Sequence, residues 1–585
     1  MTVELRLGGV SRAGQWAGAL AALVVLGVCG PAHGQALERN LPAAPKTPEA
    51  PIETPALPGS INDDNALGAQ LSSIVLLGPV SPVVSAVSAP GVDASAAPRM
   101  NHPHAVAVLK PFLGRPISRK LIADIETAIV LEYRRQGFPF VEVSTPEQEI
   151  TGGVLQIRVV EFRVGKVKTP HARGGDGAYI ENQVRTGPGD AIDVTRLAQD
   201  LDWLNRYPGR NVQPTFSPGA ALGETDLSLD TTYLRPWSVN AGYANSGSPL
   251  TGMDRYFIGG SFGGHFLTDF SAAMQVTGSP DFWTAHKNPQ YESVAGRVQF
   301  ATAPRQDVEL TVDAVESNEP AFLGPFPLVI RQQTLEATLG YRSALSNLLP
   351  LPGDVVGGIE MSRQSRNAFS GDFSLFYDVV DVYQLFGEWT YAWGDRLGAT
   401  SVDVSVHGSP GDIDAGNTSA AFFNASLRPG IRATYVYGVA TVARQTRLPL
   451  GFSLLTQFNG QYAGQPLPSS QQIALGGQTA ARGYSLDDGA WDDGFVLRNT
   501  LSSPVLENGP GRFVPGLQGR IFADYGWGRD EAFRFNASVA SVGAGADLHI
   551  GRYAVAGVDI SCPLIDAPTT RAGDIHIDGR LTLTY

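Results

Sequence analysis

Cysteine is scarce in this sequence of 585 residues, which contains only Cys29 and Cys562. Cys29 falls in an N-terminal segment that we expect to be removed from the mature chain. We therefore expect no intramolecular disulfide and no cysteine metal cluster. The scarcity leaves the compartment open, because exported proteins can have disulfides but need not.

Charged residues and long apolar runs are also few. Charged residues make up 17% of the chain, compared with roughly 25% in soluble domains. The net charge of −13 disfavours a nucleic-acid surface, and no phosphate-binding loop of the form Gly-x-x-x-x-Gly-Lys-Ser/Thr occurs. Beyond the N-terminal segment, no run of about 18 apolar residues predicts a transmembrane helix. Low charge, 67 glycines and no such run suit an outer-membrane β-barrel.

The N-terminus has the pattern of a secretory signal peptide. Arg6 and Arg12 precede the apolar run 16–28, which is too short for a membrane span, and a small-residue cleavage site follows. We predict that residues 1–34 are the signal peptide. The bulky Val28 before Cys29 disfavours a lipid anchor. Because an exported chain without transmembrane helices can reside in a membrane only as a barrel, the signal peptide also favours a barrel.

Between the signal peptide and the barrel, the sequence predicts a linker and two small α/β units. Residues 35–67 are rich in proline and predict an extended spacer. Residues 68–163 contain strand patterns and a helix that Ser118 caps and Gly137 ends, although the part from Leu77 to Met100 resembles a flexible loop. Residues 164–235 repeat this plan, with Asp193 as the cap of the second helix.

Period-two alternation of apolar residues prevails in residues 236–585. Leu335, Leu339 and Tyr341 fall on one face of a strand, for example, and the last strand ends with the aromatic Tyr585. This pattern predicts many strands, each with one face toward lipid and one toward a polar lumen.

One glycine-rich stretch, residues 475–494, interrupts the alternation and predicts a long loop of the kind that is usually functional. It contains Arg482, Gly483 and Tyr484. The later strand 517–527 places Phe522, Asp524 and Gly526 on its polar face. Spacing alone favours a solvated loop arginine for Arg482 and an ordinary lumen carboxylate for Asp524.

The Arg-Gly-Tyr stretch and the Phe-x-Asp-x-Gly strand resemble the two signature motifs of the two-partner secretion transporters of the outer membrane (TpsB type), the haemolysin-activator and filamentous-haemagglutinin exporters. The resemblance implies a transmembrane antiparallel β-barrel of sixteen strands after two periplasmic POTRA (polypeptide-transport-associated) domains, at 68–163 and 164–235. It also implies that the loop folds into the barrel and that Arg482 pairs with Asp524. In a wet lumen such a pair would contribute about 0–1 kcal/mol, and more if partly desolvated. The second small unit adds to the resemblance through a spaced series of residues: Asn205, Pro208, Gly209, Arg210, Val212, Pro218, Gly219, Gly223, Thr225 and Leu227.

Three other motifs are better explained as structural features than as catalytic or metal-binding sites. Gly259–Gly263 matches the hydrolase pattern Gly-x-Ser-x-Gly, but no helix pattern follows it. His102 and His104 flank a proline and are read as solvated loop histidines, because further metal ligands are missing. The Asp-Gly runs 487–489 and 492–494 lack the ligand spacing of a calcium loop and are read as solvated turns. We therefore expect neither an enzyme nor a cofactor or metal.

The resemblance implies a transporter in the outer membrane of a Gram-negative cell, with its POTRA domains in the periplasm. Its cargo would be an unfolded partner exoprotein with an N-terminal secretion domain. Its other partners would be outer-membrane lipid and, during biogenesis, the barrel-assembly machinery, with no nucleic acid. The alternative is a factor that inserts other barrels, but such factors more often carry three or five POTRA domains.

Overall fold

The computed structural model describes residues 52–84, 89–265, 268–284, 287–323, 326–371, 373–507 and 515–585. The predicted signal peptide (1–34) and the first part of the predicted linker (35–67) lie outside these residues. Contacts divide the chain into two compact units, one of which contains Arg235–Tyr585 and the other most of the described residues before it. Within the described ranges, no helix is both long and apolar enough to cross a membrane.

The first unit begins with a mixed sheet in the order β2-β1-β4-β3, in which β2 and β4 run parallel to β1. Helix α3 lies against this sheet and buries Ile125, Ile129 and Tyr133 in a common core. As predicted, α3 starts after Ser118, whose Oγ accepts a hydrogen bond from the backbone N of Leu121 at 3.1 Å. The elements are β1 (Ser73–Leu77), β2 (Gly91–Asp93), α2 (Pro103–Leu109), η1 (Lys110–Phe112), α3 (Arg119–Arg135), β3 (Val141–Ser144) and β4 (Val154–Glu161).

A second, three-stranded sheet follows in the order β5-β7-β6. Helix α5 packs Leu197, Leu201 and Leu204 on it, and Asp193 caps that helix as predicted by accepting from two backbone N–H groups. The elements are β5 (Arg163–Lys168), α4 (Asp176–Gln183), α5 (Val194–Asn205), β6 (Arg210–Pro218) and β7 (Glu224–Tyr233).

The segment before α3 differs from its sequence interpretation. Residues 91–93 form strand β2 rather than a flexible loop, and His102 is the N-cap of α2 rather than a solvated loop residue. The Nδ1 of His102 accepts from the backbone N of Ala105 at 3.4 Å. Proline at the first helical position favours this start, because the N–H it lacks would have no partner there. The sequence interpretation missed α2 because the helix is only seven residues long.

A buried carboxylate stabilises this part of the fold. The side chain of Glu132 on α3 is 3% exposed and accepts bonds from Arg135 at 2.6 and 2.8 Å and from Gln136 at 2.8 Å. The hydrogen bonds from Arg135 lower the pKa of the Glu132 carboxyl to about 2, although burial acts in the opposite direction. Because the pKa is lower in the folded state, the contribution is present above about pH 4.5 and is lost as the pH falls toward 2.

We expect Glu132→Gln to lower the free energy of unfolding of this unit by about 1–3 kcal/mol at neutral pH, because Arg135 loses a charged acceptor. The difference from the wild type should disappear as the pH approaches 2. Denaturant unfolding of the full chain, followed by its helical circular dichroism at several pH values, measures this effect. Glu147→Gln, at an exposed position, is the matched control; an equal loss in both variants would contradict the assignment.

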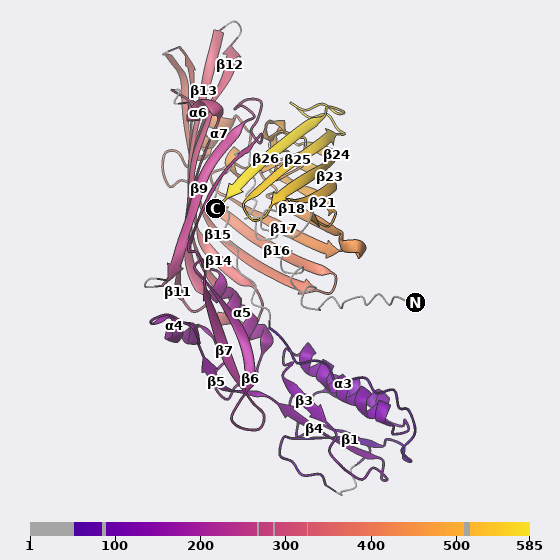
Figure 1. Ribbon diagram of the computed structural model, residues 1–585. Helices are drawn as coiled ribbons and strands as arrows, with labels where there is room; N and C mark the ends of the chain where they lie inside the picture. Colours follow the sequence, from indigo (N-terminus) through magenta and orange to yellow (C-terminus); the bar gives the residue numbers. More distant parts are fainter. Residues whose placement is uncertain are drawn as a thin grey trace, which may run out of the picture. The chain divides into compact units, whose positions relative to one another are not determined.

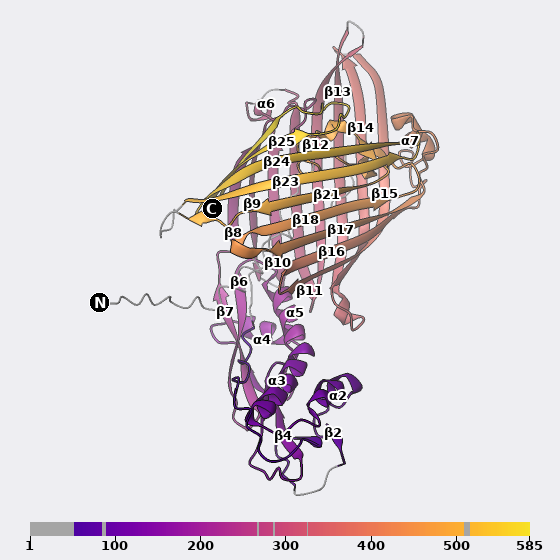
Figure 2. The same ribbon diagram turned by 90° about the vertical axis from the view of Figure 1, so that its right-hand side faces the viewer.

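The second unit is a closed barrel of sixteen antiparallel strands (Figures 1 and 2). Strand β22 (Leu506–Glu507) only continues the pairing of β21 with β23. The strands are β8 (Trp237–Ala244), β9 (Arg255–His265), β10 (Asp269–Gly278), β11 (Tyr291–Ala303), β12 (Gln306–Leu323), β13 (Phe326–Ala344), β14 (Asp354–Ser370), β15 (Phe373–Asp395), β16 (Gly398–Ser409), β17 (Tyr435–Arg447), β18 (Ser453–Tyr462), β21 (Asp493–Ser502), β23 (Pro515–Asp530), β24 (Phe535–Ile550), β25 (Ala554–Pro563) and β26 (His576–Thr584).

The faces of the strands follow the predicted alternation. Leu335, Leu339 and Tyr341 of β13 are 41–45% exposed on the outer face, where a lipid bilayer would cover them. The barrel closes where β26 pairs with β8, and Tyr585 and Val239 exchange two backbone hydrogen bonds there. We call the end of the barrel at which β8 starts and β26 ends the proximal end, and the opposite end the distal end.

Candidate functional site

The glycine-rich stretch belongs to a loop, residues 463–492, that connects β18 to β21 at the distal end. It contains a two-stranded pair, β19 (Ile473–Ala474) with β20 (Ala490–Trp491), and the short helices η4 (Ser469–Gln471) and η5 (Leu486–Asp488). Leu475 and Tyr484 of the loop form one buried cluster with Val496 of β21 and Val539 of β24. Val496 and Val539 stand opposite Gly526 on the two strands that flank β23, on the face that also carries Phe522 and Asp524. The loop therefore packs on the inner wall of the barrel.

Arg482 of this loop meets Asp524 of β23. The Nε and Nη2 atoms of Arg482 donate to the two carboxylate oxygens of Asp524, each at 2.7 Å, and the backbone N of Arg482 donates to the same carboxylate at 3.1 Å. The two side chains are 9% and 0% exposed. The pair is thus bidentate and buried, the geometry in which loss of one partner costs most.

Two further wall residues complete the surroundings of the guanidinium group. The Phe522 ring lies 3.7 Å from the Arg482 Cζ and offers a cation–π contact. Thr500 of β21 accepts from the Nη2 of Arg482 at 3.0 Å. The hydroxyl of Thr500 is neutral, so Asp524 supplies the negative charge of this contact.

The other motif residues hold the loop against the wall. Gly483 has a φ of +85°, and a Cβ there would lie 2.8 Å from the Oγ of Ser561, so only glycine fits without strain. The hydroxyl of Tyr484 lies 2.9 Å from the carbonyl oxygens of both Ala540 and Ile565 and donates to one of them at a time. Gly526 has no side chain, which leaves room for Leu475 of the loop. The structure therefore brings all six predicted residues together, whereas their functional role stays a prediction.

The Asp-Gly runs are not solvated turns, contrary to the sequence interpretation. Asp488, Asp492 and Asp493 are 5%, 0% and 6% exposed. The carboxylate of Asp488 accepts from the backbone N and hydroxyl groups of Thr569 and Thr570, at 2.6–3.1 Å. These aspartates are anchors of the folded-in loop, and the reason is that buried backbone N–H groups need acceptors.

Sequence analysis also missed a second ionic cluster at the distal end. Arg428, in the loop between β16 and β17, donates to Asp530 at 2.6 Å and to Asp492 at 2.5 Å. No local pattern marks this cluster, because its members are 64 and 102 residues apart along the chain.

The hydrolase-like motif Gly259–Gly263 lies within strand β9, where its residues pair with β10. It has no turn into a helix, so its serine lacks the strained, exposed position that nucleophilic attack requires.

Comparisons with known proteins agree with this architecture. Residues 415–548 match the family model described as haemolysin secretion/activation protein ShlB/FhaC/HecB, and residues 91–161 match the POTRA domain of ShlB type. The outer membrane transporter CdiB-2 of Burkholderia pseudomallei (strain 1026b) is 23% identical over 444 residues, which cover 73% of this chain and 72% of that protein. The hemolysin transporter protein ShlB of Serratia marcescens is 23% identical over 437 residues, 68% of this chain and 70% of that protein.

Among solved structures, CdiB from Escherichia coli has the same fold, with a TM-score of 0.67, 17% identity, and coverage of 91% of this chain and 94% of that chain. The barrel, the two small α/β sheets and the matches to both family models support one conclusion. Over the matched residues the chain is similar to the haemolysin secretion/activation proteins ShlB/FhaC/HecB, and it is an outer-membrane transporter of two-partner secretion with periplasmic POTRA domains.

Proposed function

We propose that this chain captures an unfolded partner exoprotein of the adhesin or haemolysin type through its N-terminal secretion domain and passes it through the barrel to the cell surface. In this proposal residues 68–163 and 164–235 are the two POTRA domains and residues 236–585 the barrel. Relatives named as transporters of haemolysin and of heme/hemopexin support an exoprotein as the cargo.

The observation that carries the proposal is the buried pair of Arg482 and Asp524, which fixes a long loop to the inner wall of the barrel. A loop placed there limits the width of the lumen, so cargo can pass only if the loop shifts. The pair then acts as a latch that defines the resting position of the loop. Folding of the cargo outside the cell would give the direction, because a folded product cannot diffuse back.

Cargo capture through strand addition needs an unsatisfied sheet edge. The free edge of β6 is a poor template, because the side-chain amide of Asn205 already bonds both the N–H and the C=O of Val212, at 2.7 and 2.9 Å. Further along the same edge, Pro214 has no N–H to offer. The outer edge of β5 is covered as well, since Val164 exchanges backbone bonds with Gly189 and Asp190.

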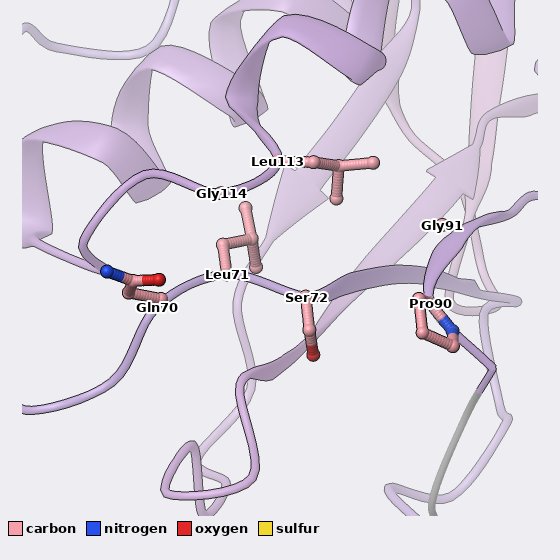
Figure 3. Close-up of a pocket in the computed structure, with 7 residues that line it drawn as sticks. All are labelled: Gln70, Leu71, Ser72, Pro90, Gly91, Leu113 and Gly114. Atoms are coloured by element: carbon pink, nitrogen blue, oxygen red, sulfur yellow. The ribbon is translucent and has the colours of Figure 1, made fainter.

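The edge strand β2 is the better candidate. A hollow lies where β1 and β2 begin, and Figure 3 shows Leu71 and Leu113 beside it, with Gln70 and Pro90 toward its two ends. An extended segment added to β2 could place an apolar side chain in this hollow while its backbone bonds the strand. Peptides recognised by strand addition combine these two contacts.

We expect Val92→Pro to weaken binding of the cargo's secretion domain about tenfold, which corresponds to the loss of about one hydrogen bond. Gly91 directs its N–H toward Ser72 of the preceding segment, so the N–H of Val92 points to the free edge. The measurement is the affinity of the full-length chain, in detergent, for an N-terminal fragment of the exoprotein encoded beside it. Leu131→Ser, at an exposed position on α3, is the control, and equal affinities of the two variants would exclude β2 as the edge.

The remaining partners follow from the barrel itself. The exposed apolar residues of the outer face would contact outer-membrane lipid. During biogenesis, the alternating strand β26, with Tyr585 after it, would be presented to the barrel-assembly machinery.

Deletion of this chain tests the function as a whole. Export of the neighbouring exoprotein should stop, while the amounts of other outer-membrane barrels stay unchanged. A general loss of barrels with normal export would instead identify a barrel-assembly factor.

A further inference from the structure

The loop between β16 and β17, residues 410–434, covers an unpaired edge of the barrel wall. Strand β15 pairs with β16 only from Leu385 onward, so the distal part of β15 has a free edge on this side. The loop satisfies the backbone groups of Asp381 at that edge. The backbone N of Asp381 donates to the carbonyl of Gly416 at 3.0 Å, and the side-chain amide of Asn417 donates to the carbonyl of Asp381 at 2.8 Å.

Helix α7 (Ser419–Ser426) of this loop packs on the lumen side of the wall. Its Phe422 is 1% exposed and belongs to a buried cluster with Val380 and Val382 of β15 and with Tyr435 and Tyr437 of β17. These wall residues lie on the inner face. Leu385 of β15 and Val436 of β17 occupy the alternate positions of the same strands, which point outward, and they are 63% and 57% exposed. Leu467, from the loop that carries Arg482, joins the same cluster. The two loops thus meet inside the distal mouth.

Arg428 ties this loop to two others. Leu427, the residue that follows helix α7, has the left-handed conformation, and the next residue, Arg428, directs its guanidinium group to Asp492 and Asp530. The three side chains are 10%, 0% and 6% exposed. Asp492 ends the folded-in loop and Asp530 ends β23, so one arginine joins segments from three distal connections.

Asp492 is itself a junction. Besides Arg428, it accepts from the backbone N of Leu467 at 2.8 Å, from the side chain of Gln472 at 2.9 Å and from the backbone N of Glu531 at 2.8 Å. None of these groups takes part in the contact between Arg482 and Asp524. The cluster is therefore a separate restraint on the loops, nearer to the distal end than the latch.

We infer that the β16–β17 loop is a second gate of the pore and that Arg428 is the positioning residue that holds it closed. The inference rests on the proposed passage of cargo through the lumen. An extended chain with its side chains is about 10 Å across, so a lumen narrowed by both loops would have to release both. Freeing Arg428 from the two aspartates would let α7 leave the wall together with the end of the other loop.

A reversible cross-link tests the gate without disturbing the ionic cluster. A Cβ built at Gly416 lies 3.1 Å from the Cβ of Asp381. Disulfides have Cβ atoms about 3.5–4.5 Å apart, so a shift of the loop by a few tenths of an ångström allows the bond. In a Cys562→Ser background, Gly416→Cys with Asp381→Cys would tie the loop to β15. We expect the oxidised protein in planar lipid bilayers in KCl to open at least about tenfold less often than the reduced protein.

The matched control places a disulfide in the wall but away from the loop. Ser401 and Ala443 are register partners on β16 and β17, so Ser401→Cys with Ala443→Cys should leave channel opening unchanged. Opening that persists in the oxidised loop variant, or an equal block by the wall disulfide, would overturn the gate.

Arg428→Met provides a second, opposite test. It keeps the apolar part of the side chain but removes the charge, so we expect at least about tenfold more frequent opening, and Arg428→Lys should restore part of the closure. Heat-modifiable migration in gels verifies that the variant barrels are folded. Unchanged opening in a folded Arg428→Met barrel would refute the role of Arg428. Because conductance needs no cargo, these results are independent of whether the chain exports an exoprotein.

Discussion

Arg482→Ala should reduce secretion of the partner exoprotein about tenfold or more while the barrel remains assembled in the outer membrane. The expected loss of secretion is larger than for a pair in a water-filled lumen. The sequence interpretation placed the pair in such a lumen, whereas the structure buries both side chains. Removal of one partner from a buried, bidentate pair costs roughly 3–5 kcal/mol. The uncompensated carboxylate of Asp524 would then favour states in which the loop leaves its position on the wall.

A double-mutant cycle separates the latch from general damage. If Arg482 and Asp524 act through each other, the Arg482→Ala/Asp524→Ala double variant should secrete no less than either single variant, with a coupling energy of about 0.5–3 kcal/mol. Secretion is measured as the exoprotein in the medium relative to barrel in the outer membrane. Arg529→Ala is the control, because Arg529 lies on the same strand but is half exposed and forms an ion pair with Glu531 rather than with the loop. Additive losses, or an equal defect in the control, would contradict the latch.

The architecture could be predicted from the sequence because the membrane imposes a simple rule. A strand with lipid on one side and a polar lumen on the other must alternate, so residues such as Leu339 and Tyr341 mark the outer face without any knowledge of neighbouring strands. The helix caps at Ser118 and Asp193 were predictable because they are also local. Each side chain accepts from N–H groups within the first turn of its own helix.

The contents of the lumen could be predicted only in part. Arg482 and Asp524 were recognised through their resemblance to family motifs, whereas spacing alone favoured a solvated arginine. Arg428 has no motif, and its partners are brought to it only by closure of the barrel. The Asp-Gly runs were misinterpreted because a short polar turn and a buried anchor have the same composition. The difference lies in Thr569 and Thr570, which reach Asp488 from another loop, about 80 residues later in the chain.

Asp488→Ala should release the folded-in loop from the connection between β25 and β26. The carboxylate accepts four hydrogen bonds from Thr569 and Thr570 and a fifth from the backbone N of Ser485 at 2.8 Å. Its removal leaves these donors without their acceptor in a buried site, which costs roughly 3–5 kcal/mol. The cost should appear as local opening of the loop, because the strand pairs of the barrel are unaffected.

Trypsin treatment of intact cells measures that opening, because the peptide bond after Arg482 is protected while the loop lies on the inner wall. We expect cleavage there to be at least about tenfold faster in Asp488→Ala than in the wild type, and intermediate in Asp488→Asn, whose amide keeps one acceptor oxygen. Asp566→Asn is the matched control, since that carboxylate lies in the facing connection and, among the residues that the structure describes, accepts the exposed N–H of Ala572 at 2.9 Å. If Asp488→Ala is as resistant as the control, the folded-in loop does not depend on this anchor, and its other contacts, among them the Arg482 pair and the Asp492 cluster, hold it in the lumen.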